Sequence, residues 1–253
     1  MGLVKTGAII LRTYKLAEAD KIAACLTEKS GMIRGVARGA RRLLSKFGAG
    51  LEPFTVVNLT YFEKEGRELV TIKESEILRS YFHVALEPET IETLEYLAQL
   101  MEEFAPPRQV DERLFRMMRA CVEAAAQSPT QVEAVARYFE LWILKLSGFL
   151  PDILNCVDCR KRLGDNPASA FLNFERGLRC ADCSGEGELY ISTGTQTQFA
   201  SMHTFGPSEW AQRYMMLSRK SQEMLSDVTR RWVRNALEKE PRRGRLSPGP
   251  SSL

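Results

Sequence analysis

The sequence of 253 residues has few of the features that most enzymes and membrane proteins require. It holds only two histidines, His83 and His203, and neither stands in a pattern of cysteine, serine or carboxylate residues typical of catalysis. It has no GxxxxGK phosphate-binding loop, and no run approaches the roughly 18 apolar residues of a membrane span. The beginning of the chain has only a four-residue apolar run after Gly7, too short for a signal sequence. We therefore expect a cytoplasmic protein that is neither an enzyme nor bound to a membrane.

The net charge of +3 conceals an uneven distribution along the chain. Lys and Arg outnumber Asp and Glu by 14 to 9 in residues 1–80, but acidic residues prevail by 12 to 6 in residues 81–155. In residues 156–253 the basic residues prevail again, by 15 to 11. Basic segments attract polyanions such as nucleic acids, whereas an acidic segment repels them and stays available for protein partners.

The N-terminal third has the pattern of short β-strands separated by turns. Apolar, β-branched and aromatic residues gather in five segments, at 4–12, 21–26, 32–37, 54–62 and 68–73. Turn residues lie between these segments, at 28–31 and 64–66. Five short strands in residues 1–80 predict a small closed barrel.

From residue 90 onward the apolar residues recur at every third or fourth position. This period predicts helices at 91–105, 114–125 and 132–146, and the short connections between them predict an antiparallel bundle in residues 81–150. Gly148 stands where a C-cap glycine is expected. In residues 191–240 a further helix, near 217–236, should pack on the bundle. Residues 241–253, rich in Pro, Gly, Ser and Arg, predict a disordered tail.

Four of the six cysteines lie in the turn-rich segment 151–190. Their spacing is Cys-x2-Cys, twenty residues, Cys-x2-Cys, which suits a tetrahedral zinc site with no open position for water or substrate. The sequence thus predicts one structural zinc ion in a zinc-ribbon-like loop, held by Cys156, Cys159, Cys180 and Cys183. Disulfides, a thioredoxin-type redox pair and an iron centre are the alternatives. Cys25 and Cys121 lie on apolar faces and are expected to be small buried side chains.

A basic segment without any acidic residue extends from residue 29 to residue 51. Its six cations are predicted to contact nucleic acid: Lys29, Arg34, Arg38, Arg41, Arg42 and Lys46. A solvated surface loop is the alternative interpretation. Barrels of this kind bind single strands through a cationic groove and aromatic side chains under the bases, for which Tyr14, Phe47, Tyr61 and Phe62 are candidates. Phe47, between Lys46 and Gly48, is expected to be the most exposed.

Three pieces of the sequence resemble a known family. The first comprises residues 33–42 (IRGVARGARR), 45–48 and 51–54, the second comprises residues 137–141 (RYFEL) and 146–149, and the paired cysteines follow as the third. In this order they resemble the bacterial recombination mediator RecO, over roughly residues 4–185.

The resemblance implies an N-terminal OB-fold, a helical domain and a zinc motif, hence an α+β multidomain protein. It implies a function in DNA repair and homologous recombination in the bacterial cytoplasm, in association with the nucleoid. Such a protein binds single- and double-stranded DNA, anneals complementary strands and, with RecR, helps to load RecA on DNA coated by the single-strand-binding protein SSB.

Two further questions stay open in the sequence. The resemblance implies binding of the acidic C-terminal tail of SSB, which requires an arginine beside an apolar pocket; Arg137 is a candidate, although an ion pair with Glu133 or Glu140 is the alternative. An RNA-binding or translation-associated protein with a barrel and zinc knuckles would also share the basic segment. A third hypothesis for the function is an assembly scaffold whose acidic helices bind protein partners and whose basic segment is merely solvated.

Overall fold

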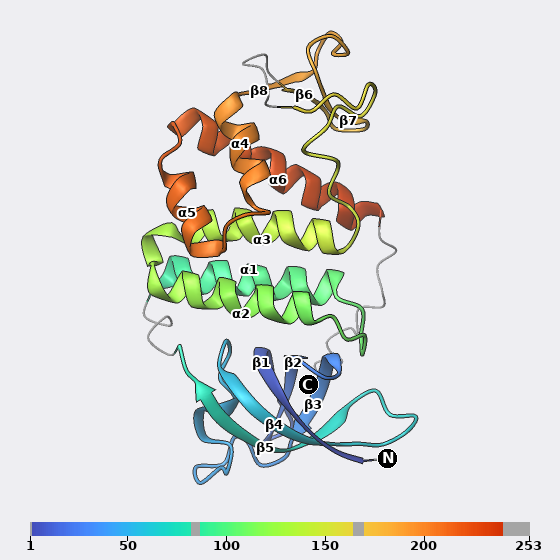
Figure 1. Ribbon diagram of the computed structural model, residues 1–253. Helices are drawn as coiled ribbons and strands as arrows, with labels where there is room; N and C mark the ends of the chain where they lie inside the picture. Colours follow the sequence, from blue (N-terminus) through green and yellow to red (C-terminus); the bar gives the residue numbers. More distant parts are fainter. Residues whose placement is uncertain (1, 82–86, 164–169, 240–253) are drawn as a thin grey trace, which may run out of the picture.

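The N-terminal strands close into a five-stranded barrel because alternate apolar side chains point into a shared interior. The strands are β1 (Gly2–Leu16), β2 (Asp20–Thr27), β3 (Gly31–Ala37), β4 (Val56–Glu63) and β5 (Val70–Arg79). Their order around the barrel is β1-β2-β3-β5-β4, and only the β3 to β5 pairing is parallel. The predicted five-stranded OB-like barrel is therefore confirmed. Figure 1 shows the computed structural model, which describes residues 2–81, 87–163 and 170–239.

Strand β1 is buried on both of its faces, which explains the short apolar run after Gly7. Ala8 and Ile10 belong to the barrel interior, whereas Ile9 and Leu11 belong to the core that the barrel shares with the helices. At Gly35 of β3 a Cβ atom would lie 2.7 Å from the Ile72 side chain, so only glycine fits there. The barrel thus has a tightly packed interior and a second apolar surface that needs a partner.

Three helices pack over the second apolar surface of the barrel and against one another. They are α1 (Pro88–Phe104), α2 (Glu112–Gln127) and α3 (Val132–Leu146), and all three were predicted. In Figure 1, α1 and α2 lie directly above the barrel, and α3 lies above them. Gly148 ends α3 with a φ of +78°, as the sequence predicted, because this left-handed conformation favours glycine.

The C-terminal part adds three helices to the far side of α3. These are α4 (Thr193–Ser201), α5 (Pro207–Met215) and α6 (Arg219–Lys239). Only α6 was predicted. Helix α4 was not predicted because it buries polar side chains. Gln196 donates hydrogen bonds to the carbonyls of Ile153 and Leu163, and Gln198 donates one to the carbonyl of Trp210. Such a helix has almost no apolar periodicity for the sequence to reveal.

The segment with the paired cysteines forms a small antiparallel sheet at the end of the molecule opposite the barrel (Figure 1). Its strands are β6 (Ala170–Asn173), β7 (Gly177–Arg179) and β8 (Leu189–Ile191), in the order β7-β6-β8. The described residues also include the short 3-10 helices η1 (Gly48–Leu51) before β4 and η3 (Pro129–Gln131) before α3. In the chain the segment with the paired cysteines stands between α3 and α4.

Ion pairs join the barrel to the first helices. Glu102 of α1 lies 2.9 Å from Arg34 of β3 and 3.6 Å from Arg12 of β1. On the other side of the junction, Arg79 of β5 lies 2.7 Å from Glu123 of α2. The acidic middle of the chain therefore partly neutralises cations of the barrel.

Two further expectations concerned the C-terminal tail and the possibility of a membrane-spanning helix. The predicted tail, residues 241–253, lies outside the described residues. Within 2–81, 87–163 and 170–239, no helix combines the length and the apolar character that a membrane crossing needs.

Candidate nucleic-acid interface and metal centre

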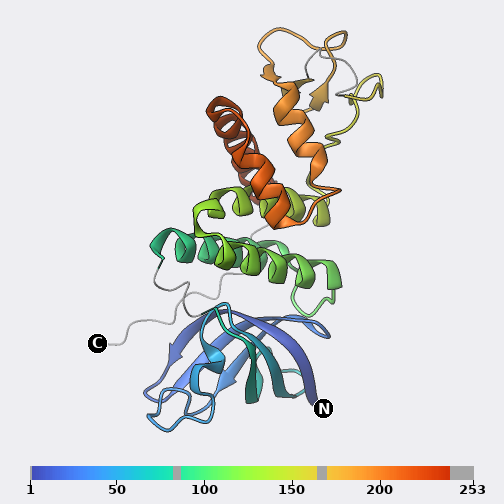
Figure 2. The ribbon, with the colours of Figure 1, turned by 60° about the vertical axis from the view of Figure 1, so that its left-hand side comes forward.

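The connection from β3 to η1, residues 38–47, forms two consecutive turns that we call the basic loop. Arg42 donates its backbone N–H to the carbonyl of Gly39, at 3.1 Å, and Ser45 donates to that of Arg42, at 3.0 Å. Gly39 has a φ of +72°, a conformation that glycine adopts without strain. In Figures 1 and 2 this medium-blue segment lies at the end of the barrel farthest from the helices.

The basic loop is attached to the turn between β1 and β2. Arg41 donates its backbone N–H to the carbonyl of Ala19, at 2.9 Å, and its guanidinium to the carbonyls of Ala17 and Glu18, at 3.0 and 2.9 Å. Asp20 accepts a hydrogen bond of 2.8 Å from the backbone of Gly39. Arg41, predicted as a nucleic-acid contact, therefore has a structural role, because it fixes the loop to this turn.

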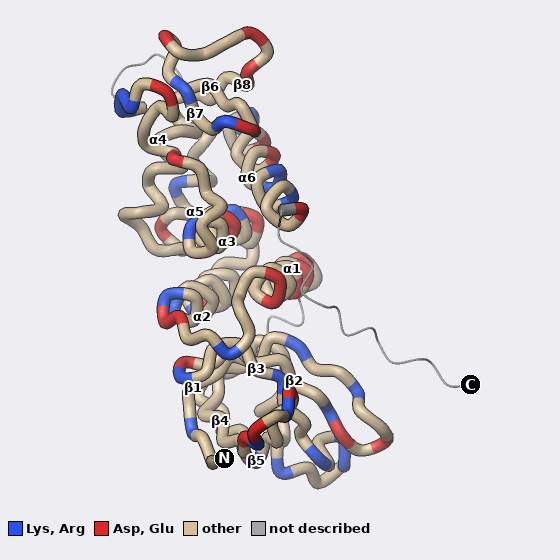
Figure 3. Tube along the Cα trace, turned by 90° about the vertical axis from the view of Figure 1, so that its right-hand side faces the viewer, with Lys and Arg blue, Asp and Glu red and all other residues tan. Residues whose placement is uncertain are grey.

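Three other cations of the loop point into solvent. Arg38, Arg42 and Lys46 are exposed, and within the described part of the chain no carboxylate lies within ion-pair distance of them. Figure 3 shows Lys and Arg positions gathered at this end of the barrel. The three side chains therefore keep their full charge for a ligand in solution.

Phe47 is not an exposed aromatic platform, and that expectation is wrong. Its side chain is only 3% exposed and packs in the barrel interior, while the ammonium of Lys46 lies 5.3 Å from the ring centroid. Burial of its apolar ring fixes the end of the loop to the barrel. Tyr61 is also fully buried, whereas Tyr14 and Phe62 are 44% and 36% exposed. Of the four aromatic candidates, only these last two could meet a base.

Lys29 and Arg34 do not lie with the basic loop. Lys29 is in the turn that precedes β3, and the seven residues of β3 separate it from the loop by roughly 20 Å. Arg34, in the middle of β3, is paired with Glu102. The six cations that are close in the sequence thus divide into a loop group and two separate residues.

Arg137 is buried within the helical part. Its side chain is 4% exposed; its guanidinium lies 3.0 Å from Glu140 and donates to the hydroxyl of Ser226 on α6, at 3.2 Å. The ion pair within α3 that the sequence left as an alternative is therefore present. Because its guanidinium already has these buried partners, Arg137 is not an available anchor for an acidic tail.

A groove of about 480 Å³ lies beside Arg137, but its lining is largely acidic. Glu89, Glu92 and Glu133 line it together with Arg137 and Arg230. Both guanidinium groups are already paired, Arg137 with Glu140 and Arg230 with Glu133 at 3.7 Å, so the three carboxylates would repel an acidic peptide.

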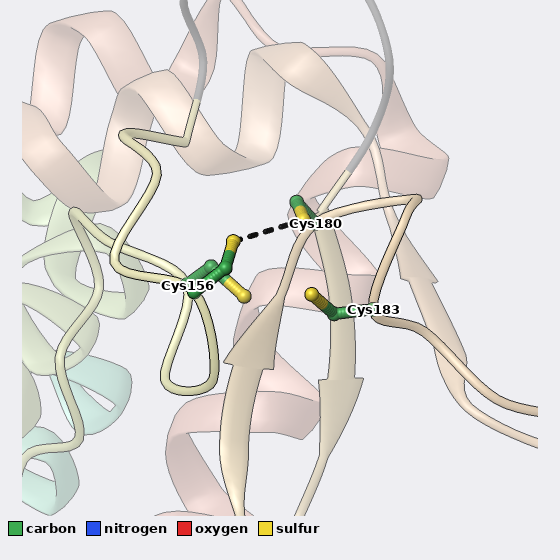
Figure 4. Close-up of side chains that lie close together, drawn as sticks. Cys156, Cys180 and Cys183 are labelled. Atoms are coloured by element: carbon green, nitrogen blue, oxygen red, sulfur yellow. Dashed lines mark hydrogen bonds between the residues drawn. The ribbon is translucent and has the colours of Figure 1, made fainter.

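Cys156, Cys159, Cys180 and Cys183 come together as one cluster. Their sulfur atoms all lie within 4.8 Å of one another, and the Sγ atoms of Cys159 and Cys180 are 3.6 Å apart. Zinc bound to four thiolates at about 2.3 Å requires sulfurs about 3.8 Å apart, so the donor set fits such an ion. Figure 4 shows Cys156, Cys180 and Cys183 with their sulfurs turned toward one another. All four cysteines are free, which disagrees with the disulfide alternative.

Backbone hydrogen bonds favour the thiolate form of one cysteine of the cluster, Cys156, whereas contact with the Cys159 thiol raises the pKa of Cys183 to about 12. Burial raises the pKa of the Cys156 thiol, but N–H donors of Cys159 and Cys180 outweigh burial and lower its pKa to about 6. Cys183 and Ser184 both donate their backbone N–H to the carbonyl of Cys180, which makes the second knuckle a tight turn.

The basic residues around this cluster are paired with acidic ones. Arg179 lies 2.6 Å from both Asp158 and Glu188, and Arg176 lies 3.1 Å from Asp158. Lys161 and Asp182 are 3.3 Å apart. These cations neutralise local carboxylates, so this part of the surface offers less positive charge than its composition indicates.

Two residues of the basic loop were not predicted as part of a site. Leu43 and Leu44 are 101% and 95% exposed, the highest exposures among the large apolar side chains of the described residues. The signal in the sequence was an apolar pair directly after two arginines, in a segment rich in turn residues.

Comparison with known proteins agrees with these features. The family model described as the N-terminal part of recombination protein O matches residues 1–81, and that of its C-terminal part matches residues 87–245. The DNA repair protein RecO of Koribacter versatilis is 33% identical over 180 residues, which cover 71% of this chain and 72% of the relative.

Two further relatives lead to the same family. The DNA repair protein RecO of Alkaliphilus metalliredigens is 29% identical over 195 residues, covering 77% of this chain and 78% of the relative. That of Cutibacterium acnes is 33% identical over 186 residues, covering 71% and 74%. Since the two family models match the barrel and the helices, and these relatives each cover more than two thirds of the chain, the chain belongs to the RecO family of DNA repair and recombination proteins.

Proposed function

We propose that this protein binds single- and double-stranded DNA through the basic loop and anneals complementary strands. The observation that carries the proposal is the group of three exposed cations, Arg38, Arg42 and Lys46, on a loop fixed to the barrel. Each cation that meets a phosphate releases a counterion, which makes binding favourable and sensitive to salt.

Annealing by this route requires no covalent chemistry. Two strands repel each other through their phosphates, and a protein that neutralises both at once removes that repulsion. Base pairing then supplies the free energy. The barrel, residues 1–80, is proposed as the nucleic-acid-binding domain, and the helices of residues 81–150 and 191–240 as its support.

We further propose one structural zinc ion in residues 151–190. Four thiolates fill a tetrahedral coordination sphere, so zinc there would hold the two knuckles together and would not activate water. The convergence of the four sulfurs within 4.8 Å supports this proposal.

Membership of the RecO family extends the proposal to partners and location. We propose that the protein cooperates with RecR and SSB in loading RecA, in the bacterial cytoplasm at the nucleoid. Helix α1 supports protein contacts in the middle of the molecule, because it carries five glutamates and no basic residue and would repel DNA.

A charge reversal in the basic loop tests the DNA-binding proposal. R38E/R42E/K46E leaves the anchors Arg41 and Phe47 intact, so the fold should persist while affinity for single-stranded DNA falls at least about a hundredfold. The neutral variant R38Q/R42Q/K46Q should reduce the slope of log affinity against log salt by about 2, since each phosphate contact on a single strand contributes about 0.7. Fluorescence anisotropy at several salt concentrations measures both.

A matched control reverses the same number of charges elsewhere. R119E/K220E/R234E changes exposed residues of α2 and α6 and alters the net charge equally. It should bind DNA within about threefold of the unmodified protein, because the affected residues lie beyond the Debye length of roughly 10 Å from the loop. If both triple variants lost affinity alike, binding would depend on net charge and the basic loop would not be the interface.

A further inference from the structure

The tip of the basic loop exposes two leucines side by side. Leu43 and Leu44 are the central residues of the turn in which Ser45 donates its N–H to the carbonyl of Arg42, at 3.0 Å. Their side chains are 101% and 95% exposed. A fully exposed leucine forgoes the free energy of burying its side chain, so two adjacent ones form an apolar tip suited to a ligand.

The leucines are held in this position from both sides. On one side, Arg41 is bound through three hydrogen bonds to the turn between β1 and β2. On the other side, Phe47 is buried in the barrel interior. The tip is therefore presented on a fixed base, and a ligand that meets it does not first have to order the whole loop.

The surroundings of the tip indicate the chemistry of that ligand. Arg42 precedes the leucines directly, and Arg38 and Lys46 flank them on the same loop, all exposed. A ligand for this surface must combine negative charges with apolar faces. Single-stranded DNA does so, because its phosphates alternate with bases whose faces are not stacked in a duplex.

An anionic lipid surface has a related chemistry but fits less well. Even a single myristoyl chain gives only marginal membrane binding, and two leucine side chains bury far less apolar surface. The described residues also offer no long apolar helix that could add to such an anchor. Apolar side chains inserted between bases are, in contrast, a known means of nucleic-acid binding.

We propose that Leu43 and Leu44 contact the bases of single-stranded DNA while Arg38, Arg42 and Lys46 hold its phosphates. This inference rests on the proposed function, DNA binding by the basic loop, and adds that the protein recognises exposed bases and not the backbone alone. It assigns base contact to aliphatic side chains, in place of the buried ring of Phe47.

A comparison of two oligonucleotides tests this assignment. One is a strand of thymidines, and the other is an abasic strand of equal length with the same phosphates. The full chain should prefer the thymidine strand, and L43S/L44S should bind that strand about tenfold more weakly. The variant should bind the abasic strand unchanged, with the same salt slope, because no charge has been removed.

Three controls accompany the experiment. L43M/L44M keeps the tip apolar and should retain the preference for bases. M216S removes an 84% exposed apolar side chain next to α5 and should change neither affinity. Circular dichroism and thermal unfolding should be the same for L43S/L44S and the unmodified protein, since neither leucine contributes to a core.

Each contrary result has a separate meaning. Equal binding of both strands by the unmodified protein, or thymidine binding unchanged in L43S/L44S, would overturn the base-contact assignment and leave DNA binding intact. Loss of binding to phosphatidylserine vesicles in L43S/L44S, with DNA binding unchanged, would overturn it in favour of a lipid surface. No binding of either strand by the unmodified protein would instead refute the proposed function.

Discussion

At the scale of single residues, the buried pair of Arg137 and Glu140 joins the helices. Glu140 is fully buried, lies 3.0 Å from the Arg137 guanidinium and accepts a hydrogen bond of 2.5 Å from the hydroxyl of Tyr96 on α1. Arg137 also reaches Ser226 of α6. Burial raises the pKa of Glu140, while the positive charge of Arg137 and the hydrogen bonds lower it. The pair thus links α1, α3 and α6 at one point.

Substitution of Arg137 should therefore be costly. R137M leaves Glu140 as an uncompensated buried charge, which should lower the free energy of unfolding by about 3–5 kcal/mol at about pH 7. R137M/E140Q removes the charge and keeps an acceptor for Tyr96, so it should recover most of the loss. Urea unfolding of both variants measures the difference. If R137M lost less than about 1 kcal/mol, the pair would not be buried in solution.

The same variant should have a characteristic pH dependence. Without Arg137, the pKa of Glu140 in the folded state lies farther above its unfolded value of about 4.3. The folded state then binds the proton more tightly, so stability is retained below the unfolded pKa and lost as the pH rises through the folded pKa. Relative to R137M/E140Q, which lacks the titrating carboxyl, the free energy of unfolding of R137M should accordingly be lower at about pH 7 than at about pH 4.

At the scale of elements, the segment of β6 to β8 depends on the cysteine cluster. Its strands have only three or four residues, and a sheet of this size contributes little stability alone. Structural zinc contributes on the order of 10 kcal/mol in small fingers. Since Gln196 of α4 binds the carbonyls of Ile153 and Leu163, the segment is also attached to the helices by hydrogen bonds.

Removal of one thiolate should release the metal and loosen the segment locally. C156A should contain no zinc, whereas C121A, which removes a buried thiol of α2 outside the cluster, should keep about one ion per chain. Hydrogen exchange should become faster in β6 to β8 of C156A and stay unchanged in the barrel. Full zinc content in C156A would contradict the four-thiolate site, and iron in the unmodified protein would identify the other metal.

At the scale of the whole molecule, the barrel and the helices share one core. Ile9 and Leu11 of the barrel belong to the same buried cluster as residues of all six α-helices. The pairs formed by Glu102 with Arg12 and Arg34 join the two parts across this junction. Because a common core couples its parts energetically, we expect them to unfold together.

A substitution inside the barrel tests that coupling. L59A truncates a fully buried side chain of the barrel interior, which belongs to the separate inner cluster, and should cost about 2–5 kcal/mol. The three tryptophans, Trp142, Trp210 and Trp232, all lie in the helical part. The unfolding midpoint measured by tryptophan fluorescence should therefore be lower in L59A than in the unmodified protein, and the midpoint measured by circular dichroism should fall with it. A fluorescence midpoint that did not move would mean that the barrel unfolds independently.

The sequence was most informative where local patterns decide the structure. Alternating apolar residues predicted the barrel strands, and a period of three or four predicted α1, α2, α3 and α6. The cysteine spacing predicted which four thiols come together. Helices α4 and α5 were missed because one buries glutamines and both have only nine residues, so neither carries an extended apolar stripe.

The sequence could not predict which side chains pair with each other, since the two partners come from segments far apart in the chain. Arg34 meets Glu102 across 68 residues, and Arg137 meets Ser226 across 89. Both residues were therefore predicted as contacts for ligands, although internal partners occupy them. By itself the sequence determined the barrel strands, helices α1, α2, α3 and α6, the cysteine cluster and the position of the basic segment, which follow from local patterns in the chain. Only the tertiary structure decided which cations stay free, because charge is neutralised and rings such as Phe47 are buried by residues that folding brings close.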